Sequence, residues 1–312
     1  MELLLLLLPL ALLGLAFGGG SDDDGSDAEP QPDTRIQTGT DARETLRGGP
    51  ADDLIFGARG ADTLLGRGGF DILVGEAGDD SLNGGDDGDI LLGGGGNDTL
   101  IGGPDGDALI GGAGDDLLYG GAGDDDIWGG SGEDVIYGGP CDDLISSLDP
   151  RGTLTPEFNT ARVGNVIGDI LTERYGPEAA ERFLPRVQNA IYSATPGDTE
   201  SDLVYGGPGD DDIFADLGDR IVGGAGVDLY VVFHAAGEEP VSVVDYEVGE
   251  PIRLVTNALE TGQIAIAEDG GGNLRISFGG SIFLILENTA LATLNPADIV
   301  VRFDGVPFAR AA

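Results

Sequence analysis

Apolar and polar positions along the chain repeat with a period of nine residues. From Gly48 to Ser146, eleven nine-residue units follow one another without an insertion. The first position of every unit is glycine, the sixth is aspartate and the eighth is leucine or isoleucine. This spacing predicts a short strand at positions seven to nine, with the position-eight side chain pointing inward, preceded by a six-residue turn.

The same period predicts how the strands stack. A strand, a turn, a second strand and a second turn take eighteen residues, so alternate units lie on the same side. Two parallel sheets then enclose a stripe of leucine and isoleucine. The turns form two rows, in which carboxylates recur at each sheet step of about 4.8 Å. Carboxylates at that spacing destabilise a fold unless a cation lies between them.

The donor chemistry of the turns selects the cation. Carboxylates and backbone carbonyls are hard oxygen ligands, which disfavours zinc, copper and iron. Magnesium demands strict octahedral geometry and retains its waters, whereas calcium accepts six to eight irregularly placed oxygens. The sequence therefore predicts several Ca²⁺ ions bound along the turns.

The units resemble the glycine-rich nonapeptide G-G-x-G-x-D-x-U-x of the hemolysin-type (RTX) calcium-binding repeats. This resemblance implies a right-handed parallel β-roll, with calcium held between successive turns by position-six aspartates and turn carbonyls. The implied metal ligands are the eleven aspartates of the array and three of a later continuation: Asp53, Asp62, Asp71, Asp80, Asp89, Asp98, Asp107, Asp116, Asp125, Asp134, Asp143, Asp202, Asp211 and Asp228.

Some units depart from the motif. Gly39 to Arg47 is a degenerate unit with Glu44 at position six, as expected of a capping repeat. We expect weak or absent binding in the early turns near Arg59 and Arg67. The substituted glycines are Ala51, Asp87, Asp105 and Cys141 at position four, and Ala58, Arg67 and Glu76 at position two.

The period disappears between residues 147 and 196. Apolar residues at helical spacing predict two helices there, in residues 156–176 and 177–192. The insertion is either a hairpin that covers one outer sheet face, its arginines offsetting nearby acids, or a partner-binding element. The same alternatives apply to the outward position-nine residues, such as Tyr119 and Trp128, which are either covered or exposed as an adhesive stripe.

The roll resumes in residues 197–231, and residues 232–312 form alternating strands with a hairpin turn at 270–273. This end of the chain resembles the segment that closes the roll in secreted metalloproteases of the serralysin type. We therefore expect a mainly β protein: a parallel β-roll over 39–146 and 197–231, a helical insertion, and a β-rich C-terminal cap.

The other end of the chain indicates export. Residues 1–20 contain an apolar run from Leu3 to Phe17, which fits either a signal peptide or a retained membrane anchor over residues 3–20. Residues 21–38 are acidic, carry two prolines and predict a flexible linker.

The amino-acid composition excludes several classes of partner, enzyme and binding site. The 312 residues include 57 acids and 15 bases, all arginine, for a net charge of −42, which excludes nucleic acid as a partner. The single histidine, His234, excludes an H-E-x-x-H zinc protease, and the sequence has no G-x-S-x-G elbow. The lone Cys141 cannot form an intrachain disulfide, and the absence of lysine excludes a P-loop.

We therefore expect an exported, non-enzymatic protein whose roll folds on binding calcium outside the cytoplasm. Two alternatives stay open. The first is an extracellular adhesin or interaction module that uses the insertion or an outer sheet face to bind a protein or carbohydrate. The second is a non-catalytic accessory to a secreted enzyme.

Overall fold

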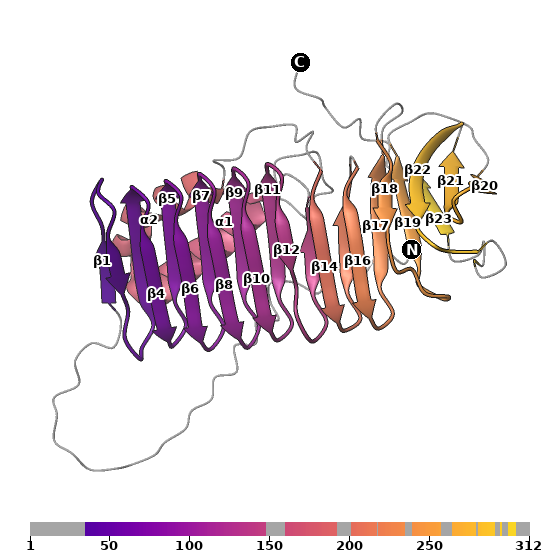
Figure 1. Cartoon of the computed structure of the whole chain (residues 1–312). Coiled ribbons are helices and arrows are strands. Elements are labelled where there is room, and N and C mark those ends of the chain that lie inside the picture. The colour runs from indigo at the N-terminus through magenta and orange to yellow at the C-terminus, as the bar shows by residue number, and fades with distance from the viewer. Residues whose placement is uncertain are drawn as a thin grey trace, which may run out of the picture.

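A computed structural model describes residues 35–147, 160–191, 201–216, 218–234, 239–256, 264–278, 280–290, 294 and 299–303. Within them the strands form two long sheets that face each other, with two helices against one of them (Figure 1). The predicted leader at 1–20 lies outside the described residues, as does the predicted linker up to residue 34.

Sheet A contains the odd-numbered strands from β1 to β19, followed by β23, in the order of the chain (Figure 1). Its eleven strands are β1 (Arg35–Thr38), β3 (Asp53–Arg59), β5 (Ile72–Ala77), β7 (Ile90–Gly95), β9 (Ala108–Ala113), β11 (Asp126–Ser131), β13 (Leu144–Ser146), β15 (Asp212–Ala215), β17 (Leu229–His234), β19 (Ile252–Thr256) and β23 (Ile299–Phe303).

Sheet B contains the even-numbered strands together with β21, and it ends in the C-terminal hairpins. Its twelve strands, in spatial order, are β2 (Thr45–Arg47), β4 (Thr63–Gly68), β6 (Ser81–Asp86), β8 (Thr99–Pro104), β10 (Leu117–Ala122), β12 (Val135–Tyr137), β14 (Leu203–Pro208), β16 (Arg220–Ala225), β18 (Val241–Val243), β22 (Ser281–Leu286), β21 (Leu274–Phe278) and β20 (Ile264–Glu268).

The register of the sheets follows the eighteen-residue circuit. Ile55 pairs with Leu73 in sheet A, and Leu64 pairs with Leu82 in sheet B, all in parallel strands. The position-eight residues of all eleven units are completely buried and form one core between the sheets. The fold is therefore a parallel β-roll, as the period predicts.

The strands are longer than the sequence predicts. Most run from position seven of one unit through position three of the next, as in Leu117–Ala122, so only positions four to six lie outside them. Gly121 pairs with Gly103 and Ala122 with Pro104 in the same ladder. Equivalent residues in stacked turns share one backbone conformation, so the ladder continues past the last apolar residue.

The roll also begins earlier than predicted. Arg35–Thr38, assigned to the linker, forms strand β1 and pairs in parallel with β3. Ile36 lies opposite Leu54, and the backbone of β1 uses the otherwise open edge of sheet A. The linker interpretation was wrong for these four residues, because pairing with an existing edge overrides a weak local pattern.

The insertion covers the outer face of sheet A. Helices α1 (Thr160–Tyr175) and α2 (Pro177–Ile191) pack on each other, and α2 contacts β5, β7 and β9 (Figure 1). Phe183 stacks on Phe56 of β3 with ring centroids 5.0 Å apart. The outward residues of sheet A thus enter a second core with the helices: Leu54, Phe56, Ile72, Val74, Ile90, Leu92, Ala108, Ile110 and Trp128. Of the two interpretations of the insertion, the structure shows the covering hairpin.

The two sheets continue across the insertion. Strand β12 pairs with β14, and β13 pairs with β15, although more than 60 residues separate the partners in sequence. Beyond the roll, β18 pairs with β22 in parallel, and β22, β21 and β20 pair antiparallel, with the hairpin turn that the glycine run predicts. No helix in the described part of the chain is long and apolar enough to cross a membrane.

Candidate metal centre

The position-six aspartates form two rows, one along each edge of the roll. Row A follows the turns before the sheet A strands: Asp53, Asp71, Asp89, Asp107, Asp125, Asp143, Asp211 and Asp228. Row B follows the turns before the sheet B strands: Asp62, Asp80, Asp98, Asp116, Asp134 and Asp202, with Glu44 before them and Asp219 after them. The fourteen aspartates predicted as ligands are each at most 3% exposed. The structure therefore brings all the predicted ligands into two continuous arrays.

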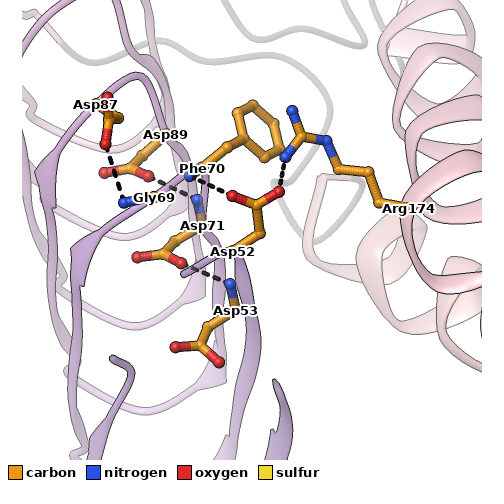
Figure 2. Close-up of polar contacts among 8 residues, drawn as sticks. All are labelled: Asp52, Asp53, Gly69, Phe70, Asp71, Asp87, Asp89 and Arg174. Atoms are coloured by element: carbon orange, nitrogen blue, oxygen red, sulfur yellow. Dashed lines mark hydrogen bonds and ion pairs between the residues drawn. The ribbon is translucent and has the colours of Figure 1, made fainter. Parts of the chain in front are cut away.

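One carboxylate oxygen of each predicted ligand except Asp53, which begins row A, has a fixed partner. Oδ1 accepts a hydrogen bond from the backbone N–H of the position-six residue in the preceding turn of its row, at 2.6 to 3.0 Å. Figure 2 shows two such steps, from Asp53 to Asp71 and from Asp71 to Asp89. The bonds hold every side chain in the same orientation, even across the insertion, where Asp134 donates to Asp202.

The other oxygen has no such partner. Oδ2 is buried and accepts no hydrogen bond in eleven of the predicted ligands: Asp62, Asp71, Asp80, Asp89, Asp98, Asp107, Asp116, Asp125, Asp143, Asp211 and Asp228. A buried carboxylate oxygen without a donor is costly, and native structures retain such groups when an ion or a function requires them.

Each of these oxygens lies beside the glycine that begins its own unit. A Cβ built on Gly111 would lie 2.5 Å from Asp116 Oδ2 and 2.5 Å from the carbonyl oxygen of Gly129 in the next turn. The same pair of groups surrounds the first glycine of most units. Glycine is required there because a side chain would fill the space between carboxylate and carbonyl. The invariant first glycine thus leaves open a cradle lined by oxygen.

Burial strongly disfavours the charged form of these carboxyls. Desolvation first, and then neighbouring aspartates, raise the pKa of Asp89 and Asp116 to about 9, although the backbone hydrogen bond to each carboxylate lowers it in part. The same causes raise the pKa of Asp98 and Asp125 to about 8, and desolvation raises that of Asp107 to about 7. The folded roll therefore needs either protons or a cation in these rows.

The donor set fits a hard cation. Among the described residues, no three His, Cys, Asp or Glu side chains converge in the way that a side-chain metal cage requires. A site in these rows would thus combine a carboxylate from the turn with backbone carbonyls, which is the oxygen-rich, irregular ligand set that Ca²⁺ accepts. The unpartnered Oδ2 atoms and the glycine carbonyls are the groups available for it.

The first unit of the array differs from the others. Oδ2 of Asp53 accepts a hydrogen bond from Gly49 N–H at 2.6 Å. Arg67 Nη1 donates to the carbonyl oxygen of Gly48 at 3.3 Å. A protein donor therefore occupies the carboxylate oxygen of this cradle, whereas the carbonyl oxygen that completes it belongs to Gly66 and not to Gly48.

The end of row B is also satisfied by the protein. Oδ2 of Asp219 accepts hydrogen bonds from Ser147 Oγ at 2.8 Å and from Asp216 N–H at 2.9 Å. The nine-residue period does not reveal this contact, because Ser147 lies 72 residues away from Asp219 and outside the repeats.

The substituted turn residues keep the conformation of glycine. Arg67 and Glu76 at position two have φ of 92° and 77°, and Asp87 and Cys141 at position four have φ of 72° and 96°. Glycine adopts such angles without strain, and other residues pay for them. Glu76 forms an ion pair with Arg186 of α2, so this departure from the motif connects the roll to the hairpin.

A second set of acids lies at position five, which sequence reasoning did not treat separately. Asp52 Oδ1 accepts from Phe70 N–H at 2.9 Å, and its Oδ2 forms an ion pair with Arg174 of α1 (Figure 2). Asp115 similarly accepts from Glu133 N–H at 3.2 Å. The half-buried Asp52 and the exposed Asp115 both accept from the following turn instead of the preceding one, so they connect successive turns on the outer side of the row.

The comparisons with known proteins agree with this geometry in the repeat region. The chain matches the family described as RTX calcium-binding nonapeptide repeat (4 copies) at residues 38–73, 65–100, 101–136, 125–148 and 197–222. No curated protein matches the chain.

Among solved structures, the chain is similar to the extracellular lipase LipA from Serratia marcescens. The two are 14% identical, the match covers 74% of this chain and 44% of the lipase chain, and the TM-score is 0.22. The match therefore spans less than half the length of that lipase. The family match and the two rows of buried aspartates show that the chain carries RTX calcium-binding nonapeptide repeats, and such repeats bind Ca²⁺ at multiple sites.

Proposed function

We propose that this chain is an exported protein whose β-roll folds when calcium fills the two rows of turns outside the cytoplasm. The observation that carries the proposal is the set of eleven buried Oδ2 atoms without a hydrogen-bond donor. These atoms make the folded chain without calcium unstable at neutral pH, because each unpaired charge must be desolvated.

Calcium concentration then controls folding. Sites of the extracellular class have Kd values of about 10⁻⁴ to 10⁻³ M, far above the free calcium inside a cell. Carboxylate repulsion keeps the chain loose there, and binding outside the cell converts ligand free energy into folding free energy. The net charge of −42 strengthens this dependence, since the unneutralised chain repels itself.

The proposed ligands are the aspartates whose Oδ2 atoms are unpartnered, together with Asp134 and Asp202, which continue row B. We place Asp53 apart from these, because the backbone N–H of Gly49 already donates to its Oδ2. The apolar segment from Leu3 to Phe17 supports export of the chain. Export would move the chain from the low free calcium of the cytoplasm to the higher calcium outside. The proposal assigns no catalytic residue.

Calcium titration of the 312-residue chain tests the proposal. Far-UV circular dichroism starts in chelator at pH 7.5, and calcium or magnesium is added separately at constant ionic strength. We expect a cooperative coil-to-β transition at sub-millimolar to millimolar calcium, with no transition at equal magnesium. A chain that is already β-rich in chelator, or that responds equally to magnesium, would contradict the proposal.

A further inference from the structure

Row A ends differently from its interior. The last repeat unit, Gly223–Val231, supplies Asp228, and no later unit of the repeat follows it. Oδ1 of Asp228 accepts from Asp211 N–H at 3.0 Å, as in every other step of the row. Its Oδ2 is buried and unpartnered, so the last turn also presents a free carboxylate oxygen.

The next group in the row is not a glycine carbonyl. In interior cradles such as that of Gly111, the second oxygen belongs to the backbone of the next turn. At Gly223, a Cβ would instead overlap Asp228 Oδ2 and the hydroxyl of Tyr230. Tyr230 is completely buried, and its hydroxyl lies close enough to the carboxylates of Asp228 and Glu250 to interact with both, although it makes no well-aligned hydrogen bond. A side-chain oxygen thus replaces the missing carbonyl.

A third buried oxygen comes from beyond the repeats. Glu250 is 2% exposed, and its Oε2 accepts from Glu247 N–H at 2.7 Å, whereas Oε1 is buried and unpartnered. Tyr230 N–H donates to the carbonyl oxygen of Pro251 at 3.1 Å, which brings Glu250 beside Tyr230, and the Glu250 carboxylate interacts with the Tyr230 hydroxyl and with the charge of Asp228. Tyr230 belongs to the same cluster: burial, and then the charge of Glu250, raise the pKa of its hydroxyl.

A fourth residue fixes the turn but offers no free oxygen. Oδ1 of Asp245 accepts from Gly223 N–H at 2.9 Å, and Oδ2 accepts from Gly224 N–H at 3.0 Å. These bonds hold the last turn against the connection between β18 and β19. The available donors are therefore Asp228, Tyr230 and Glu250.

We propose that Asp228, Tyr230 and Glu250 bind a terminal calcium ion that closes row A outside the nine-residue motif. Two carboxylates and a hydroxyl are hard oxygen donors, and a divalent cation neutralises both buried charges at once. The ion would connect the last turn of the roll to the segment before β19, so it would fasten the cap to the roll. The proposal rests on the proposed function, because it uses the same ion.

Local hydrogen exchange of the full 312-residue chain tests this site separately from the rest of the roll. Deuterium uptake is followed by mass spectrometry with saturating calcium and in chelator, for peptides that cover residues 99–122 and 241–256. The variants are Glu250→Gln and Tyr230→Phe. The matched control is Glu247→Gln, which removes an exposed carboxylate three residues from Glu250 and leaves its backbone N–H in place.

In the wild type and in Glu247→Gln, we expect calcium to protect both peptides. In Glu250→Gln and Tyr230→Phe, calcium should still protect 99–122, but protection of 241–256 should fall about tenfold or require several times more calcium. Equilibrium dialysis should find one ion fewer per chain in Glu250→Gln than in the control.

Two results would overturn the terminal site. The first is protection of 241–256 by calcium in Glu250→Gln equal to that of the wild type. The second is that Glu250→Gln by itself, in chelator and without calcium, protects peptide 241–256 from exchange. Glutamine mimics a protonated carboxyl, so this result would show that a proton shared within the cluster, and not calcium, holds the cap to the roll. A wild type without calcium-dependent protection in 99–122 would instead contradict the proposed function itself.

Discussion

At the residue scale, the two carboxylate oxygens of each position-six aspartate have different roles. Oδ1 is a structural acceptor, which bonds to the turn before it, and Oδ2 is held beside the first glycine without a donor. The neighbouring position-five acid is exposed and bonds to the turn after it. Adjacent carboxylates in one turn therefore differ in burial, in partner and in expected affinity for a cation.

Asp116 and Asp115 provide a matched pair for testing this difference. Asp116→Asn keeps the Oδ1 acceptor for Asp98 N–H but removes the buried charge, whose pKa desolvation and the neighbouring Asp134 raise to about 9. We expect it to raise the calcium midpoint of folding several-fold at pH 7.5, and to stabilise the calcium-free folded state. Circular dichroism with calcium and with chelator measures both effects.

The control for that experiment is Asp115→Asn, which changes an exposed carboxylate and should shift stability by no more than about 0.5 kcal/mol. Equal effects of the two variants would show that the buried and the exposed carboxylates contribute alike, contrary to the geometry.

Cys141 tests the backbone of the turns. It lies at position four with φ of 96°, where glycine is free of strain, and its side chain is exposed. We expect Cys141→Gly to increase the free energy of unfolding by about 1 kcal/mol, because relief of the left-handed conformation exceeds the added entropy of the unfolded chain. Guanidinium unfolding in saturating calcium measures this.

Cys141→Ser is the comparison variant, since it removes the thiol and keeps the Cβ. Its stability should stay close to that of the wild type. A glycine variant less stable than the serine variant would show that φ at this position is not strained.

At the element scale, the two outer sheet faces have different roles. The helices cover the outward residues of sheet A, with Arg174 and Arg186 paired to Asp52 and Glu76 of the roll. Sheet B keeps its outward residues uncovered by these helices. There Tyr119, Tyr137 and Tyr205 stack with ring centroids 5.0 and 4.8 Å apart, and Tyr119 is 38% exposed. The interaction-module alternative therefore concerns sheet B rather than the apolar side of the hairpin.

Phe183 tests the contribution of the hairpin to the roll. It is 3% exposed, stacks on Phe56 and lies in the core that α1, α2 and sheet A share. We expect Phe183→Ala to lower the free energy of unfolding in saturating calcium by about 3 kcal/mol, since it opens a cavity at this interface. Denaturant unfolding followed by circular dichroism gives the value.

Glu181→Ala, two residues away on the exposed side of α2, is the control and should change stability by less than about 0.5 kcal/mol. An equally small effect of Phe183→Ala would mean that the hairpin does not stabilise the roll.

At the scale of the whole molecule, two rows of buried carboxyls connect stability to pH. In the folded chain the pKa of Asp71 is about 8, that of Asp80 about 7 and that of Asp89 about 9, mainly because of desolvation. In the unfolded chain an aspartate titrates near about 3.9. Between these values the folded state binds more protons, so its stability without calcium falls as pH rises.

We therefore expect acid to replace calcium. In chelator the roll should gain β structure as pH decreases from 9 towards 5, and it should lose it again when pH returns through 7 to 9. Towards pH 5, where the calcium-free chain is folded with protonated carboxyls, calcium must displace protons, so the calcium midpoint should decrease as pH rises and binding should release protons. Circular dichroism across pH, and calorimetry in buffers of different ionisation enthalpy, check the two signs. Greater stability at pH 9 than at pH 5 in chelator would contradict the burial of these carboxyls in the calcium-free fold.

The sequence alone determined the repeat architecture of this protein. Glycine at position one, aspartate at position six and an aliphatic at position eight recur in every unit from Gly48 to Ser146, so local chemistry predicts the core, the turns and the oxygen-lined rows together. It also predicted both insertion helices, because their apolar spacing is helical. For the repeat architecture, the nine-residue motif is enough, since each unit contacts its neighbours in the same way.

Only the tertiary structure decided what depends on residues far apart in the chain. It places α2 on β5, β7 and β9 instead of against a partner, pairs β1 with the edge at β3, and lets Ser147 satisfy Asp219. It also brings Glu250 to Asp228 and Tyr230 at the end of row A. These contacts cross sequence gaps that no period spans, and they form because an open edge, an apolar face or a buried charge must find a partner in the folded chain.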